Sequence, residues 1–176
     1  MRESPGQFVL SKSTLSELTD TLSHEYEAFR TRDLSGYAVA YLFLDAVYEP
    51  WRRWGSKTGV FCVWAICEEG RKVLLTLSTA HRESYESSLE VRRDLVKRGL
   101  QTPVTITTDG APGLTKAIDV LWPKSVRIRC WLHTRQNLQQ KVPPQAWPEF
   151  KALVMDMREA PTVAEAERRR QLIVNR

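Results

Sequence analysis

Apolar residues recur with a helical period at the start of the chain. Leu15, Leu18 and Leu22 stand at helical spacing within the polar stretch of residues 9–35, which begins with cap-type residues at Ser11. This pattern predicts a short amphipathic helix. Two interpretations stay open: the second helix of a helix-turn-helix, whose N-terminus would lie on DNA phosphates, or a solvated helix that leads into the core.

The period changes to that of β-strands between residues 39 and 78. Both faces of residues 39–48 are mainly apolar, so this stretch is predicted to be a buried, central strand. Two more apolar stretches follow, at residues 60–67 and 72–78. Because a tight turn with Gly70 available for positive φ separates these two, we expect the three strands to form an antiparallel meander.

Helices and strands alternate in the next part of the chain. The expected elements are a helix over residues 84–98, a strand over 104–108, a helix over 113–121, a strand over 124–130 and helices after His133. The first of these helices has an apolar stripe of Tyr85, Leu89, Leu95 and Val96, and Gly99 would end it. A meander followed by such crossovers predicts an α/β fold with a mixed sheet and flanking helices, in the order β-β-β-α-β-α-β.

Composition and charge narrow the class of protein. The 176 residues are 42% hydrophobic and 27% charged, which is typical of a globular protein. A net charge of +5 and a sequence pI of about 9.3 favour a polyanionic partner, and we expect nucleic acid rather than a membrane. No apolar run approaches the roughly 18 residues of a spanning helix. Cys62, Cys67 and Cys130 are scattered, so we expect a reducing, cytoplasmic location without a disulfide framework.

Two aspartates are the strongest candidates for chemistry. Asp45 lies within an apolar strand, where an ionised carboxylate costs several kcal/mol unless it is paired or binds a metal. Asp109 follows the strand at residues 104–108, at the kind of strand end where sheet proteins expose reactive groups, although aspartate before glycine is also a common turn signal. If the two strands are adjacent, the carboxylates would share a divalent cation, and their hard oxygen atoms suit Mg²⁺ or Mn²⁺.

A Cys-x-x-His pair and three basic segments are weaker candidates. Cys130 and His133 have the spacing of two zinc ligands, but a closed structural site needs four, so we expect them to shape the edge of the active site instead. DNA contacts are expected from Arg52, Arg53, Lys57, Arg127, Arg129 and Arg135. The tryptophans beside the first two arginines would either stack on bases or fold back onto the sheet edge.

Four motifs together resemble the catalytic core of Mutator-type (MULE-like) bacterial insertion-sequence transposases. They are residues 41–48 (YLFLDAVY), the hairpin at residues 68–72, residues 108–118 (TDGAPGLTKAI), and residues 129–133 followed by Asn137 and residues 141–143. The resemblance implies a ribonuclease-H-like fold and an Asp-Asp-Glu triad with a pair of Mg²⁺ ions, in which Asp45 and Asp109 would be the first two acids. Cys130 and His133 match the family's Cys-x-x-His signature.

The same resemblance implies that part of the catalytic machinery lies elsewhere. The third acid of the family is a glutamate far beyond Asp109, so we expect the chain to stop before the last catalytic helix. Residues 1–36 would then be the end of a DNA-binding region, residues 37–142 the catalytic core and residues 143–176 the start of a helical insertion. The expected partners are double-stranded DNA, as transposon ends and target, and further copies of the chain on that DNA. The alternative is a non-catalytic DNA-binding remnant of a transposase.

Overall fold

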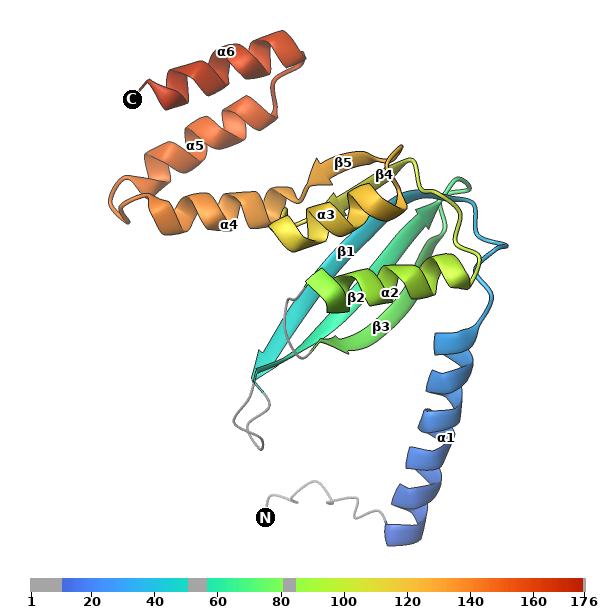
Figure 1. Ribbon diagram of the computed structural model, residues 1–176. Coiled ribbons are helices and arrows are strands. Elements are labelled where there is room, and N and C mark those ends of the chain that lie inside the picture. Colours follow the sequence, from blue (N-terminus) through green and yellow to red (C-terminus); the bar gives the residue numbers. More distant parts are fainter. Residues whose placement is uncertain (1–10, 51–56, 81–84, 176) are drawn as a thin grey trace, which may run out of the picture. The chain divides into compact units, whose positions relative to one another are not determined.

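The chain forms two compact units, Met1–Ile128 and Arg129–Arg176 (Figure 1). The computed structural model describes residues 11–50, 57–80 and 85–175. The division into three parts at residues 36 and 142 stays a prediction.

The elements follow the predicted order within a few residues. Up to the boundary between the units they are α1 (Lys12–Thr31), β1 (Val39–Pro50), β2 (Lys57–Cys67), β3 (Lys72–Ala80), α2 (Tyr85–Lys97), β4 (Thr105–Thr108), α3 (Pro112–Leu121) and β5 (Val126–Arg129). The second unit contains α4 (Trp131–Lys141), α5 (Trp147–Arg158) and α6 (Val163–Val174). Within the described ranges, no helix combines the length and the apolar character that crossing a membrane requires.

One mixed sheet organises the first unit. Its strand order is β3-β2-β1-β4-β5. The pairs β1–β2 and β2–β3 are antiparallel, whereas β1 and β4 are parallel. Gly70, in the turn between β2 and β3, has the predicted positive φ of 85°. This topology confirms the α/β mixed sheet and the ribonuclease-H-like arrangement that the family resemblance implied.

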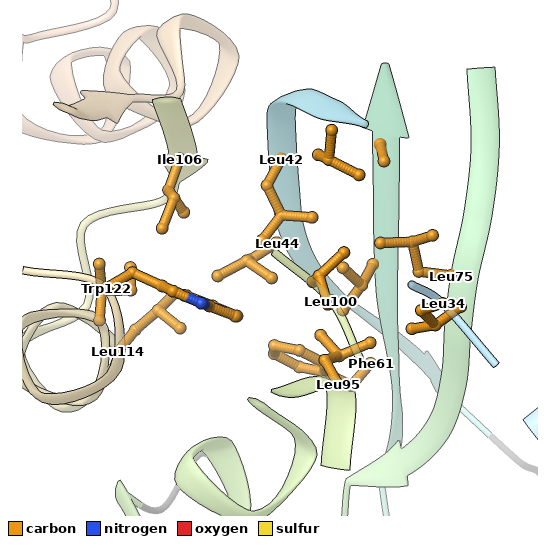
Figure 2. Close-up of a cluster of buried hydrophobic side chains, with 14 residues drawn as sticks. Leu34, Leu42, Leu44, Phe61, Leu75, Leu95, Leu100, Ile106, Leu114 and Trp122 are labelled. Atoms are coloured by element: carbon orange, nitrogen blue, oxygen red, sulfur yellow. The ribbon is translucent and has the colours of Figure 1, made fainter. Parts of the chain in front are cut away.

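The hydrophobic core lies between the sheet and two helices. Figure 1 shows α2 and α3 across the same face of the sheet. Leu42 and Leu44 of β1 and Ile106 of β4 point into this layer, where Leu95 of α2 and Trp122, just after α3, meet them (Figure 2). These five side chains are at most 2% exposed. The crossover of helices onto one face therefore buries every second residue of the central strands.

The opposite face of the sheet is open to solvent, so the prediction that β1 is buried on both faces was wrong. Tyr41 is 49% exposed, Phe43 36% and Trp64 on β2 37%. β1 is central, as predicted, but within the described residues α2 and α3 pack on its other side. Asp45 shares the strand alternation of Tyr41 and Phe43 and is exposed.

An arginine outside the predicted apolar stripe of α2 takes a position in the core. Leu89 and Leu95 are buried as predicted, whereas Val96 is 42% exposed. Arg92 has no exposed surface, and its guanidinium carbon lies 5.7 Å from the ring centroid of Phe61 on β2. Burial lowers the pKa of Arg92 to about 10. The long side chain of Arg92 therefore lies in the layer between α2 and the sheet, beside Leu89 and Leu95 of the predicted stripe.

Side chains from the neighbouring helical segments bond the backbone of β3, an edge strand of the sheet. The donors are Tyr26 in α1, Arg32 at its C-cap and Arg98 just after α2, and the acceptors are the carbonyl oxygens of Leu77, Leu74 and Leu75, in that order. The Tyr26 hydroxyl donates over 3.0 Å. The bonds from Tyr26 and Arg32 tie the C-terminal end of α1 to the sheet, and the bond from Arg98 ties the end of α2 to it.

Ion pairs and a stacked arginine hold the helices of the second unit together. Arg169 of α6 contacts Glu165 in its own helix and Asp156 in α5, each at 2.7 Å. Hydrogen bonds from Arg168 and then Arg169 lower the pKa of Glu165 to about 2. Arg158 of α5 lies over the ring of Trp131 in α4, 5.5 Å from its centroid. Charged side chains therefore take part in the contacts between α5 and α6 and between α4 and α5.

Candidate functional site

The register of β1 with β4 brings the two candidate aspartates level with each other. The Cα partners are Tyr41 with Thr105, Leu42 with Ile106 and Phe43 with Thr107. Asp45 lies two residues further along β1, and Asp109 lies two residues after Thr107, directly beyond the end of β4. Because adjacent strands lie about 4.8 Å apart, carboxylates at one level can reach a common cation.

Both aspartates belong to the open face of the sheet. In β1 the residues alternate between exposed Phe43 and Asp45 and buried Leu44. In β4 the buried Thr108 lies between Thr107 and Asp109, which are both half-buried. Side chains alternate between faces along a strand, so the two carboxylates are on the face opposite α2 and α3.

A tight turn fixes the backbone at Asp109. The carboxylate oxygen Oδ1 of Asp109 accepts a hydrogen bond of 2.9 Å from the backbone N–H of Ala111. The N–H of Gly110, which has a φ of 86°, donates to Thr108 Oγ1 over 3.1 Å. Pro112 then begins α3. Asp109 thus stabilises the turn, as aspartate before glycine commonly does. The same turn holds its carboxylate at the end of β4.

Cys62 is a neighbour of Asp45 that the sequence analysis did not single out for this site. The two residues are Cα partners in the antiparallel pairing of β1 with β2. Burial raises the pKa of the Cys62 thiol, and the negative charge of Asp45 raises it further. Cys62 and Asp45 are therefore neighbours on adjacent strands, and Asp109 follows the end of the strand on the other side of β1. Only the strand register reveals this neighbour, and no local sequence signal encodes it.

The Cys-x-x-His pair lies at the start of a helix in the second unit. Cys130 is the N-cap residue of α4, and His133 lies in the first turn of that helix. Both side chains are half-buried. Among the residues that the structure describes, no group of three or more His, Cys, Asp and Glu side chains is arranged to hold a metal ion. The described part of the chain therefore contains the two aspartates without a third acidic ligand.

The predicted DNA-binding residues have different environments. Arg127 on β5 forms an ion pair with Asp119 of α3. Arg129 is exposed, and Arg135 on α4 is half-buried. Arg52 and Arg53 lie outside the described residues, as does the side chain of Lys57. Contact of these residues with DNA stays a prediction.

The chain is similar to known transposases along nearly its whole length. The family model described as "Transposase, Mutator family" matches residues 3–175. The transposase for insertion sequence element IS6120 of Mycolicibacterium smegmatis is 32% identical over 158 residues, which are 90% of this chain and 49% of that protein. The transposase for element IS1081 of Mycobacterium tuberculosis is 32% identical over 161 residues, 90% of this chain and 39% of that protein.

Among solved structures, the chain is similar to the HTLV-2 integrase catalytic core domain in complex with magnesium. The TM-score is 0.39 at 13% identity, over 78% of this chain and 85% of that one. The chain spans about half or less of the length of the two transposases. With its family motifs in the predicted order and a family match over residues 3–175, this chain belongs to the Mutator family of transposases.

Proposed function

We propose that this chain forms the nucleotidyl-transfer core of an Asp-Asp-Glu DNA transposase, with Asp45 and Asp109 as its first two acids. The observation that carries the proposal is the pairing of Phe43 with Thr107 on adjacent parallel strands, because Asp45 and Asp109 each follow two residues later. Neither residue is needed by the hydrophobic core, which lies on the other face. Family membership supports the same assignment, because the relatives are transposases of insertion sequence elements.

The chemistry of the two side chains fits a hard divalent cation. Carboxylate oxygens are the preferred protein ligands of Mg²⁺ and Mn²⁺. One oxygen of Asp109 is oriented by the N–H of Ala111, and Asp45 is exposed, so solvent and a DNA strand can reach it. Such an ion, when bound, supplies charge neutralisation and activation of the attacking oxygen during in-line attack on a phosphodiester. The two aspartates would hold and orient the ion. The other residues of the open face would position the DNA strand.

The proposed partner is double-stranded DNA, both as transposon ends and as target. The net charge of +5 supports binding to phosphates, with Arg127, Arg129 and Arg135 as the described candidates and Arg52, Arg53 and Lys57 completing the set. All three cysteines are free thiols, which supports a reducing, cytoplasmic location.

We further propose that the third acid comes from outside the described residues, so that this chain by itself binds metal weakly and does not transpose. The support is that the chain spans about half or less of its relatives and that its described residues offer two aspartates without a third acidic ligand. The same observation favours one alternative function, a non-catalytic DNA-binding remnant of a transposase.

Metal binding is the direct test of the two aspartates. Titration calorimetry with Mn²⁺ should show that Asp45→Asn and Asp109→Asn each weaken binding at least about tenfold. Asp20→Asn, which neutralises an exposed carboxylate on α1, is the matched control and should leave binding unchanged. An equal loss of Mn²⁺ affinity in all three variants would refute the assignment of Asp45 and Asp109 as metal ligands. An Mn²⁺ affinity that none of the variants alters would refute it as well.

A DNA cleavage assay distinguishes the proposed transposase core from the alternative, a non-catalytic DNA-binding remnant. Joining the chain to a C-terminal segment from a longer relative should produce Mg²⁺-dependent DNA nicking that Asp45→Ala abolishes. Nicking by the chain alone, also lost in Asp45→Ala, would support the aspartates and contradict the proposed absence of the third acid. A joined protein that binds DNA without nicking would favour the remnant.

A further inference from the structure

The C-terminal ends of α1 and α2 border an open cavity of about 500 Å³. The segments that follow the two helices are joined by a hydrogen bond of 2.7 Å from the N–H of Leu34 to the carbonyl oxygen of Arg98. The residues that line the cavity are Arg30, Thr31, Asp33, Asp94, Lys97, Arg98 and Gly99. Because five of these seven side chains are charged, the cavity is suited to a small ionic ligand.

The guanidinium of Arg98 lies in the wall of this cavity with part of its hydrogen-bonding capacity unused. Its side chain is only 7% exposed. Nε lies 2.9 Å from Oδ2 of Asp94, and Nη2 donates to the carbonyl oxygen of Leu75 over 3.3 Å. Nη1 is buried and has no hydrogen-bond partner among the described residues. A buried N–H group of a charged side chain is costly without an acceptor, which favours an acceptor that a ligand supplies.

The other carboxylates at this place already have partners. Glu27 forms an ion pair with Arg30 at 2.6 Å. The carboxylate of Asp33 accepts hydrogen bonds from the N–H and the hydroxyl of Ser35. These contacts engage the two acidic side chains away from Nη1 of Arg98.

Positive charge accumulates around Arg98. Burial lowers the pKa of its guanidinium. The nearby charges of Arg32 and Arg30 lower this pKa further, whereas Asp94 raises it. Lys97 is exposed, and within the described ranges its side chain forms no ion pair or hydrogen bond. A bound anion would reduce the repulsion among these cations and accept hydrogen bonds from two of them.

We propose that this cavity binds a phosphate group through Nη1 of Arg98 and the ammonium of Lys97. A phosphate group offers several acceptor oxygens to donors that converge on it, and guanidinium and ammonium groups are its usual partners in proteins. Basic residues in the last turn of a helix also offset the helix dipole. That role accounts for Arg30 and Lys97, but it does not account for a buried guanidinium with an unused donor.

The phosphate group can come from the DNA backbone or from a free phosphate ion. The first source rests on the proposed function, because double-stranded DNA is the partner proposed for this chain. The site itself needs neither DNA nor a metal ion, and neither Asp45 nor Asp109 lines the cavity.

Titration of the full chain with inorganic phosphate at constant ionic strength, followed by ¹H–¹⁵N NMR, tests the site. The amide signal of Gly99, in the cavity wall, should shift to saturation with a dissociation constant on the order of millimolar. Lys97→Gln should raise this constant about fivefold. Lys12→Gln, which removes an exposed lysine at the other end of α1, is the matched control and should leave the constant unchanged.

Lys97 is the residue to replace because Arg98 also bonds the backbone of β3, so that its loss would disturb the fold. A Gly99 signal that does not saturate at millimolar phosphate would overturn the site. A dissociation constant that is the same for Lys97→Gln and the unmodified chain would overturn it as well. Asp45→Asn should leave phosphate binding unaltered, so failure of the proposed metal site and failure of this site would be seen separately.

Duplex DNA distinguishes the two sources of the phosphate group. If the group belongs to the DNA backbone, Lys97→Gln should lower the slope of log affinity for duplex DNA against log salt concentration by about 0.9, the loss of one phosphate contact. Free phosphate should then compete with the duplex at the Gly99 signal. An unchanged slope together with phosphate binding that depends on Lys97 assigns the site to a free phosphate ion.

Discussion

The two faces of β1 should respond very differently to loss of a side chain. Leu42 has no exposed surface and points into the core, so Leu42→Ala removes its transfer free energy and leaves a cavity, at a cost of about 3 kcal/mol. Tyr41, the preceding residue, is 49% exposed on the open face. Tyr41→Ala forfeits about half the transfer free energy of a buried side chain and encloses no cavity, so it should cost about 1 kcal/mol. The expected difference is about 2 kcal/mol.

Urea denaturation followed by far-UV circular dichroism measures this difference. The comparison is valid if the two variants and the unmodified chain share one slope of free energy against urea concentration. Equal destabilisation by Tyr41→Ala and Leu42→Ala would mean that both faces of β1 are buried. That result would contradict the accessibility of Asp45, which follows Tyr41 on the same face, and with it the proposed metal site.

Two further predictions concern the first and the second unit. Gly99 and Gly70 both have positive φ, at 93° and 85°, but a Cβ at Gly99 would lie 2.9 Å from Ser35 Cβ while one at Gly70 would meet nothing within 4 Å. Thermal unfolding should therefore show a loss of about 1 kcal/mol for Gly70→Ala and a larger loss for Gly99→Ala; equal losses would contradict the close approach. The arginines of α6 hold the pKa of Glu165 at about 2, below its ordinary 4.5, so the stabilisation they give is present above pH 4.5 and lost as the pH falls toward 2. Helix content followed by circular dichroism should show this acid loss, and Glu165→Gln should reduce it; an unchanged acid transition in that variant would refute the ion pairs.

Local signals made most of the elements predictable. Ser11 caps α1 by accepting a hydrogen bond from the Thr14 N–H, and Gly70 and Gly99 adopt the positive φ that ends β2 and α2. Such signals act over a few residues and can be recognised without the fold. Burial was harder to predict. The exposed face of β1 and the buried Arg92 depend on which helices pack on which side of the sheet, and this is decided by residues far away in the sequence.

The candidate site was predictable in its residues more than in its geometry. An aspartate within an apolar strand and another at a strand end are visible in the sequence because such carboxylates are costly without a role. Their common level depends on the register of β1 with β4, which is a long-range pairing. The pairing of β1 with β2, which is also long-range, places Cys62 beside Asp45. No spacing along the chain encodes either relation.

The bonds that side chains make to β3 restrict how this sheet can grow. Carbonyl oxygens of Leu74, Leu75 and Leu77 are already engaged by donors from the helical segments, so an incoming strand would have to displace them before it could hydrogen-bond there. Fibril-like stacking and strand exchange are thereby discouraged along the β3 edge of the sheet.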